Sequence, residues 1–325
     1  MSTSEIPRAL LVVNPVARRA ARLMEPAANA LETAGFRCDV LVTSAPGDAA
    51  RIARSEAEAY DAVFALGGDG TVMEVLGAMP ENGPPVGVLH GGTGNLLAQA
   101  LGVPRRVGPA VRALLTGTVG RIDLARLADG RRFALAAGVG VDAAMIAETS
   151  RRLKRRLGVL AYVYTGMRAL LRFERFAARI EVDGRVHEQE ASAVLVANFG
   201  TLLHDLIKLG DGIEYDDGLL NVCVFAPKSF RDSVRVAHRL LRGDFRSDPC
   251  LWYAAGRRIS VETDPLRMAQ ADGELIGNTP LTAEVEPMRA TVFLPAAPRL
   301  KGRRGARPAT PESGFSTRGS YGQRN

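Results

Sequence analysis

Residues 62–76 read AVFALGGDGTVMEVL, and this stretch indicates the fold class of the chain. Its apolar first part predicts a buried strand, and a helix is expected from residue 71, directly after the turn GGDGT. Glycines between a strand and a helix let backbone N–H groups approach phosphate oxygens without an intervening Cβ. A carboxylate beside phosphates repels them unless a divalent cation lies between, so Asp69 favours a nucleotide–Mg²⁺ site over a turn made for packing alone.

Strand and helix patterns alternate through the first 120 residues. Strands are expected at 8–13, 37–43, 62–66 and 86–89, and helices at 17–34, 48–58, 71–78 and 96–101. This alternation predicts a parallel sheet whose ligands bind at the carboxyl ends of the strands. Asn14, Asp69 and a second glycine turn, GGTGN at 91–95, each follow a predicted strand. We therefore expect three polar loops at one edge of the sheet.

The pattern changes after residue 120. Short strands separated by Gly, Asp and Asn turns are expected at 121–127, 132–137, 178–182, 191–197, 219–225, 258–262, 269–275 and 281–287. They predict a mostly antiparallel β domain, interrupted by helices at 143–176 and 229–243, and a last strand at 291–294 could return to either domain. The expected organisation is an α/β nucleotide domain over residues 1–122, a β-rich domain over residues 123–296 with a cleft between them, and a disordered basic tail over residues 297–325.

Composition excludes several classes of protein. The hydrophobic fraction of 46% and charged fraction of 24% are typical of a soluble globular protein. From residue 299 onward seven Lys or Arg residues face one acid, so the tail carries +6 of the net charge of +7 and nucleic acid is not an expected partner. Three cysteines without metal-ligand spacing, and no pattern of a signal peptide or membrane span, predict a cytoplasmic protein.

Acidic residues beside glycine recur along the chain. They occur as GDG at 68–70, GVGVDA at 138–143, DDG at 216–218 and DGE at 272–274. Each of these alone is a common turn signal. Together with two glycine turns that could bind phosphate, they favour a metal–phosphate site.

The motifs GGDGTVMEVLGAM, HGGTGNLLAQALGVP, GVGVDAAM, DDGLLNV and QADGE, in this order and spacing, resemble the diacylglycerol kinase catalytic family. That family includes bacterial diacylglycerol and other lipid kinases, sphingosine kinases and ceramide kinases. The resemblance covers residues 8–294, although GGDGT alone is shared with NAD kinases and phosphofructokinases. It implies phosphorylation of a lipid hydroxyl with ATP and Mg²⁺, and diacylglycerol, giving phosphatidic acid, is the expected acceptor.

The resemblance also implies roles for individual residues. The ATP phosphates would be cradled by Gly67, Gly68, Gly70 and Thr71, and Mg²⁺ held by Asp69. The remaining walls of the nucleotide cleft would be Asn14, Gly92, Thr93, Gly94 and Asn95.

Four further acids receive roles from the same resemblance. Asp272 would be the general base that takes the proton of the lipid hydroxyl, with Glu274 supporting the ATP or metal side. Asp123 would pair with that base, and Asp217 would help to order Mg²⁺ in the second domain. Phosphoryl transfer, which depends on positioning and charge neutralisation, suits such a set of acids.

Three positions depart from the family pattern. Leu96 stands where GTGN is usually followed by Asp, Asn221 replaces the usual Asp after DGLL, and the NPxSG loop reads NPVAR from Asn14. Two alternatives stay open. The first is an NAD kinase-like enzyme that phosphorylates a soluble nucleotide, and it follows from the shared GGDGT motif, although QADGE and the basic helix expected at 150–175 argue against it. The second is a catalytically weak lipid-binding regulatory module, and it follows from Leu96 and the altered NPxSG loop.

Residues 150–175 combine a basic cluster with an apolar and aromatic run. This pattern is typical of an amphipathic helix on an anionic membrane, and equally of a helix packed on the β domain with a solvated basic end. We expect transient, peripheral association with the inner face of the membrane. The sequence leaves open whether the chain forms a homodimer.

Overall fold

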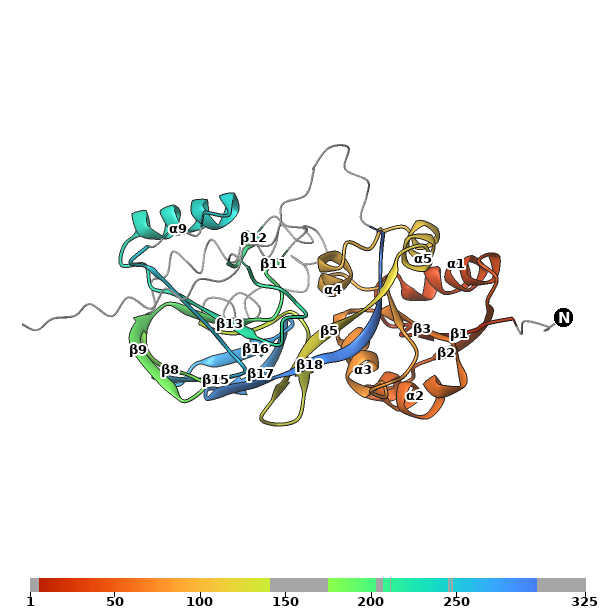
Figure 1. Ribbon diagram of the computed structural model, residues 1–325, viewed down its shortest axis with the longest axis horizontal. Coiled ribbons are helices and arrows are strands. Elements are labelled where there is room, and N and C mark those ends of the chain that lie inside the picture. The colour runs from red at the N-terminus through yellow and green to blue at the C-terminus, as the bar shows by residue number, and fades with distance from the viewer. Residues whose placement is uncertain are drawn as a thin grey trace, which may run out of the picture.

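The computed structural model describes residues 6–140, 175–202, 207–210, 212–244, 246 and 248–296. Helices cover a sheet at one end of the molecule, and the other end is built mainly of strands (Figure 1). The helix expected over 143–176 and the membrane-binding segment predicted at 150–175 lie outside the described residues up to residue 174, and the basic tail lies outside them entirely. The end of the expected helix is wrong, because Phe176 is the first residue of a strand, β8 (Phe176–Val182). Within the described part of the chain, no helix is both long and apolar enough to span a bilayer.

The N-terminal half is an α/β layer structure, as its sequence predicts. Its strands are parallel in the order β2-β1-β3-β4, and they are β1 (Arg8–Val13), β2 (Arg37–Val42), β3 (Ala62–Gly67) and β4 (Val86–His90). Every residue of β3 and β4 is buried, because helices cover both faces of this part of the sheet.

The helices of this half lie on both faces of the sheet. They are α1 (Ala20–Thr33), α2 (Asp48–Glu56), α3 (Asp69–Ala78), α4 (Leu96–Ala100) and α5 (Val107–Leu115), with a 3₁₀ turn at Ala57–Ala59. α1 packs with α5 on one face, and α2 packs with α3 on the other (Figure 1). α5 was not expected from the sequence, and α3 begins at Asp69, two residues before the expected start.

Strand β18 (Leu281–Leu294) joins the two halves. It pairs in parallel with β4 at Val292 and antiparallel with β5 (Thr118–Leu127) and β15 (Arg258–Asp264). The two strands expected at 281–287 and 291–294 are therefore one strand, with a register shift between Glu286 and Ala290. Among the described residues the result is one ten-stranded sheet in the order β2-β1-β3-β4-β18-β15-β8-β9, which β5 and β6 extend beside β18.

A second, antiparallel sheet packs on the distal part of the first. Its order is β14-β13-β10-β7-β16-β17, and a small hairpin of β11 and β12 lies beside it. The remaining strands of the two sheets and the hairpin are β6 (Arg132–Phe133), β7 (Ala136–Gly140), β8 (Phe176–Val182), β9 (Arg185–Ala191), β10 (Ala193–Ala197), β11 (Thr201–Leu202), β12 (Ile207–Lys208), β13 (Leu220–Phe225), β14 (Leu251–Gly256), β16 (Met268–Ala271) and β17 (Glu274–Asn278). One buried cluster, which includes Phe133, Ile180, Val222 and Ile259, fills the space between the sheets.

Helix α9 (Phe230–Arg242) covers the outer face of the second sheet, where Val236 packs with Leu195 and Phe225. Ser229 caps its first turn by accepting a hydrogen bond from the Asp232 amide, and Gly243 ends it in the left-handed conformation. The sequence predicts this helix correctly, but strands β9 and β14 were not expected.

Candidate active site

The two glycine turns pack directly against each other at the carboxyl ends of β3 and β4. The Gly91 amide donates to the Gly67 carbonyl at 3.0 Å. A Cβ at Gly92 would lie 2.6 Å from the Gly68 Cα, so only glycine permits this approach. The loop after β1 joins them, because Asn14 Nδ2 donates to Thr71 Oγ1 at 3.0 Å. The structure thus brings together the three loops that the sequence placed at this edge.

The N-terminus of α3 is the open end of this arrangement. Its N-cap, Gly68, has extended backbone and no side chain to cap the helix, so the first N–H groups of α3 have no side-chain partner from the cap. A ten-residue helix with uncapped amides beside a glycine turn fits a phosphate group. Asn95, at φ 50°, shapes the facing turn by bonding both the amide and the carbonyl of Gly92, and Thr93 is exposed beside it.

Asp69 connects α3 to α4. Its Oδ1 accepts hydrogen bonds from the Leu96 amide at 2.5 Å and the Leu97 amide at 3.3 Å. Its Oδ2 lies beside Gly94, where a Cβ would approach it to 2.6 Å. Burial raises the pKa of Asp69 although these amides favour its charged form. The carboxylate therefore neutralises the N-terminus of α4 and leaves that of α3 for an anion.

Asp272 lies in the tight turn between β16 and β17, at φ 44°. Its carboxylate accepts hydrogen bonds from the amides of Ala134, Leu135 and Ala136 at 2.7, 2.9 and 3.1 Å. Burial raises the pKa of Asp272 to about 6 against the effect of these amides, and the nearby charge of Asp69 adds to the rise. A fixed carboxylate that titrates near neutrality suits a general base.

Glu274 reaches from β17 across to the first glycine turn. A Cβ at Gly70 would lie 2.7 Å from Glu274 Oε1, so this exposed side chain stands beside the start of α3. Asp69, Asp272 and Glu274 thus come from both halves of the molecule to one place.

The acids around the first glycine turn fit Mg²⁺ only together with a nucleotide. In the described part of the chain, no three His, Cys, Asp or Glu residues form a metal cluster by themselves. Mg²⁺ commonly takes one or two carboxylates together with substrate phosphates, and Asp69 and Glu274 beside α3 offer that donor set.

Asp123 and Asp217 occupy a different place. Asp123 is fully buried in β5, and its carboxylate accepts from the amides of Gly218 at 2.7 Å and Met288 at 2.6 Å. These bonds hold the turn that carries Asp217 and the bulge of β18, and they are not directed to Asp272. Asp217 is exposed and accepts from the Leu219 amide; partial burial and then the charge of Asp123 raise its pKa.

Asn198 is a residue that the motif reasoning missed. It is fully buried, and its Nδ2 donates to the carbonyls of Asp123 at 2.9 Å and Ala134 at 2.8 Å. Its backbone amide donates to the Leu135 carbonyl at 2.8 Å. Asn198 therefore fixes the segment whose amides hold Asp272. The sequence did contain one signal for Asn198, because it directly follows the strand predicted at 191–197, just as Asn14 follows a predicted strand.

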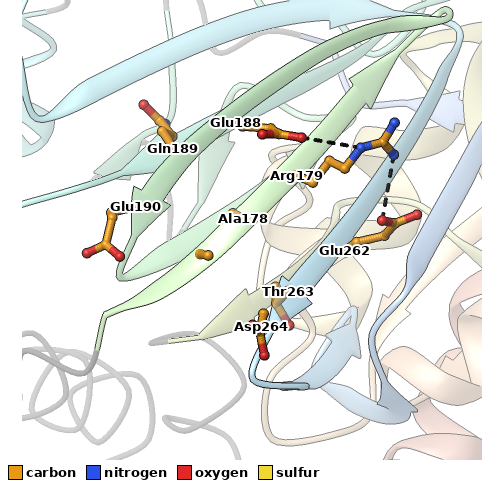
Figure 2. Close-up of a pocket in the computed structure, with 9 residues that line it drawn as sticks. Ala178, Arg179, Glu188, Gln189, Glu190, Glu262, Thr263 and Asp264 are labelled. Atoms are coloured by element: carbon orange, nitrogen blue, oxygen red, sulfur yellow. Dashed lines mark ion pairs between the residues drawn. The ribbon is translucent and has the colours of Figure 1, made fainter.

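A cavity of about 500 Å³ lies elsewhere, on the part of the first sheet formed by β8, β9 and β15 (Figure 2). Arg179 in this cavity pairs with Glu188 and Glu262, each at 3.6 Å. Such exposed ion pairs contribute little free energy. None of the site residues predicted from the sequence lines this cavity.

Comparison with known proteins agrees with this geometry. The model of the diacylglycerol kinase catalytic domain matches residues 8–127, and that of the YegS C-terminal NAD kinase beta sandwich-like domain matches residues 135–294. The fold and the paired glycine turns are thus those of a kinase with a nucleotide-binding α/β half. Since the two models match most of the chain, the protein belongs to the diacylglycerol kinase catalytic-domain family.

Relatives and solved structures support the same assignment. An uncharacterized protein of Synechocystis sp. is 31% identical over 74% of this chain, which spans 57% of that relative's length. A diacylglycerol kinase of Bacillus subtilis is 29% identical over 84% of this chain and 91% of its own. A crystal structure from Bacillus anthracis, provisionally named a diacylglycerol kinase, has 25% identity and a TM-score of 0.76, covering 89% of this chain and 97% of its own.

Proposed function

We propose that this protein is an ATP- and Mg²⁺-dependent lipid kinase that phosphorylates the free hydroxyl of diacylglycerol to give phosphatidic acid. The observation that supports it best is that the turn of Asp272 and Glu274 lies beside the open N-terminus of α3. There Glu274 Oε1 would be 2.7 Å from a Cβ at Gly70, and burial together with the charge of Asp69 raises the pKa of Asp272. A base on one half of the molecule thus faces a phosphate-binding turn on the other half. The relatives named diacylglycerol kinase suggest the acceptor.

In this mechanism the amides at the start of α3 bind the phosphates of ATP, and Asp272 accepts the proton of the lipid hydroxyl. The hydroxyl oxygen forms a bond to the γ-phosphorus as the bond from that phosphorus to the β–γ bridging oxygen breaks, and ADP leaves. Asp69 and Glu274 would hold Mg²⁺, which supplies positive charge to the transferring group. With a pKa of about 6, Asp272 is mostly ionised at pH 7 and can act as the base.

A panel assay tests the proposal. Labelled ATP and Mg²⁺ are incubated with the full chain and mixed micelles that contain diacylglycerol, sphingoid base, ceramide, phosphatidylglycerol or undecaprenol, and with NAD in a separate arm. We expect label in phosphatidic acid, and no label when Mg²⁺ is chelated. Label in NAD would indicate the NAD kinase-like alternative, and ATP binding without turnover on any acceptor would indicate a regulatory module. Either result would overturn the proposal.

We further propose that the chain works at the inner face of the membrane, because its acceptor resides in a bilayer. The basic segment predicted for this purpose at 150–175 falls almost entirely outside the described residues.

A further inference from the structure

Helix α9 presents a divided outer face. Ser233 and Val236 are buried against the second sheet, each with 2% exposure. Near the start of the helix Phe230 and Val234 remain 55% and 49% exposed, although both are large apolar side chains. The helix is thus anchored by Ser233 and Val236 and leaves an apolar edge, Phe230 and Val234, in solvent.

Basic residues occupy the other edge of that outer face. At 100° per residue, Arg231, Arg235 and Arg242 fall together, with His238 between them and the apolar edge. All four side chains are exposed. An apolar edge beside a cationic edge, on a helix that lies along the protein surface, is the pattern of an interfacial helix.

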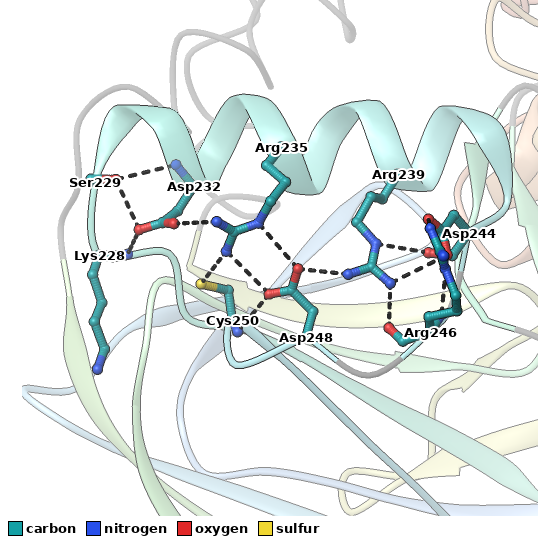
Figure 3. Close-up of polar contacts among 9 residues, drawn as sticks. All are labelled: Lys228, Ser229, Asp232, Arg235, Arg239, Asp244, Arg246, Asp248 and Cys250. Atoms are coloured by element: carbon teal, nitrogen blue, oxygen red, sulfur yellow. Dashed lines mark hydrogen bonds and ion pairs between the residues drawn. The ribbon is translucent and has the colours of Figure 1, made fainter.

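The charge of this surface is positive overall, and three of its arginines are held by ion pairs. Residues 228–248 carry six Lys or Arg residues and three Asp. The buried Asp248 binds Arg235 at 3.2 Å and Arg239 at 2.7 Å (Figure 3). Asp244 binds Arg239 and Arg246.

Asp232 also binds Arg235, at 2.8 Å. The three carboxylates therefore orient Arg235, Arg239 and Arg246 without neutralising the segment. A cavity of about 570 Å³ opens here, lined by Arg235, His238, Arg239, Arg242, Asp244 and Arg246.

We propose that the outer face of α9 docks on an anionic phospholipid bilayer, with Phe230 and Val234 entering the headgroup region and the arginines meeting lipid phosphates. The inference rests on the proposed function insofar as a lipid acceptor requires contact with a membrane. Charge alone would equally suit a nucleic acid. The exposed apolar edge favours a bilayer, which would bury Phe230 and Val234. The phosphates of a nucleic-acid duplex would leave these two side chains in water.

The position of α9 agrees with this role. α9 contacts β12, and β11, the partner of β12 in its hairpin, contacts α4. α4 begins at the amides that Asp69 caps. In Figure 1, α9, the hairpin and α4 lie along the same side of the molecule. Docking through α9 would therefore place α4, which begins at the candidate site, on the side of the molecule that faces the bilayer.

Vesicle co-sedimentation of the full chain tests the proposal without any need for catalysis. Phosphatidylcholine vesicles with phosphatidylglycerol are compared with phosphatidylcholine alone, at low and high salt. We expect binding only to the anionic vesicles, weakened by salt. Arg231→Glu combined with Arg242→Glu should lower the affinity about tenfold or more, and Phe230→Ser should lower it with the charge unchanged. Arg54→Glu, an exposed charge reversal on α2, is the matched control and should bind like the wild type.

Circular dichroism shows that each variant is folded, and turnover of a short-chain, water-dispersed diacylglycerol should remain unchanged. The proposal is overturned if the wild type ignores anionic vesicles, or if the α9 variants bind them as the wild type does. It is also overturned if duplex DNA competes fully and Phe230→Ser has no effect. Vesicle binding without turnover on any lipid would instead contradict the proposed function and leave the docking surface supported.

Discussion

Asp272 combines a backbone conformation that few residue types adopt with a carboxylate held by three amides. A positive φ of 44° favours Gly, Asn and Asp, so Asn is the replacement that best preserves the turn. Asp272→Asn removes the proton acceptor and keeps an oxygen for the amides of Ala134 to Ala136. We expect at least a ~100-fold loss of turnover on diacylglycerol with ATP binding retained, measured by labelled-ATP assay and calorimetry.

Asp183→Asn is the matched control for that substitution. Asp183 also has a positive φ, 48°, and accepts backbone amides, those of Arg257 and Arg258, in the β8–β9 turn. This variant should keep its turnover. Full activity of Asp272→Asn would remove Asp272 from the mechanism.

The raised pKa of Asp272 predicts how the rate depends on pH. Because the base must be ionised, turnover at saturating ATP should rise about tenfold per pH unit up to about pH 6 and then level off. The stability of the fold should change with pH in the opposite direction to turnover. The folded state binds this proton more tightly than the unfolded chain, whose Asp has a pKa of about 4. The stabilisation that this proton gives is therefore lost as pH rises from about 4 through about 6.

Comparison with Asp272→Asn isolates that contribution. The melting temperature of the variant should rise relative to that of the wild type as pH increases over the same interval. Above that interval the difference between the two melting temperatures should stay constant. A rate profile without a break near pH 6 would contradict the assignment of Asp272 as the titrating base.

Asn198 is predicted to act on catalysis only through the segment that holds Asp272. Asn198→Ala leaves the carbonyls of Asp123 and Ala134 without their donor, which costs about 1–3 kcal/mol for each buried group. We expect a lower melting temperature, a lower kcat with unchanged KM for ATP, and a shifted break in the pH–rate profile. Asn221→Ala is the control, since the Asn221 Nδ2 has no hydrogen-bond partner among the described residues. An unmoved pH profile would reduce Asn198 to a purely structural role.

At the residue scale, the sequence predicted the acids that stand in short motifs. Asp69 and Asp272 were identified because glycine turns surround them. The surroundings of Asp123 and Asn198 could not be predicted this way, because their partners lie far along the chain. Asp123 bonds Gly218 and Met288, so its burial and its contacts depend on how β18 crosses β5.

Between the elements α3 and α4, the Asp69 carboxylate binds the Leu96 and Leu97 amides, and in the proposed mechanism it would also hold Mg²⁺. Asp69→Asn keeps an oxygen for the Leu96 and Leu97 amides but removes the charge, whereas Asp69→Ala removes both. We expect both variants to lose Mg²⁺-dependent turnover. Only the alanine variant should lose stability, by about 1 kcal/mol, as measured by urea unfolding.

Asp48→Ala provides the comparison for that pair of variants. The Asp48 carboxylate, in the first turn of α2, accepts hydrogen bonds from the amides of Ser44 and Ala45 in the preceding loop and has no place in the candidate site. Its loss should lower stability and leave turnover intact. An active Asp69→Asn enzyme would show that Asp69 serves only to join the two helices.

Strands and helices were predicted correctly where both faces of the element are buried, or where one face is clearly buried, because burial leaves an apolar pattern in the sequence. The apolar strands β1, β3 and β4 stand out in the sequence, and so does α9 with its cap at Ser229. β9 was missed because its residues, RVHEQEA, are mostly polar at the edge of the sheet, and β14 is only partly buried. β18 was divided in two because Pro287 interrupts its pattern, and only pairing with β5 shows that the strand continues through a bulge.

The whole molecule is tied together along α3 and β18. Glu274 stands beside the first turn of α3, while Arg132 Nη1 and Arg289 Nη2 donate to the carbonyls of Gly77 and Met79 at its other end. Arg132 also pairs with Glu286 of β18. β18 pairs with β15 near its start and with β4 near its end. The first sheet is therefore continuous between the halves. The site between the halves is therefore held by elements that belong to both.

This continuity predicts that the two halves unfold together. Trp252, the single tryptophan, lies in β14 of the second sheet, whereas most described helices belong to the N-terminal half. Tryptophan fluorescence and far-UV circular dichroism should therefore give coincident urea midpoints. Asp123→Ala removes the acceptor of the Gly218 and Met288 amides and should lower the free energy of unfolding by about 3 kcal/mol. Both midpoints should therefore fall by the same amount. A fluorescence transition that separates from the dichroism transition, in the wild type or in the variant, would show that the halves unfold independently and that β18 does not couple them.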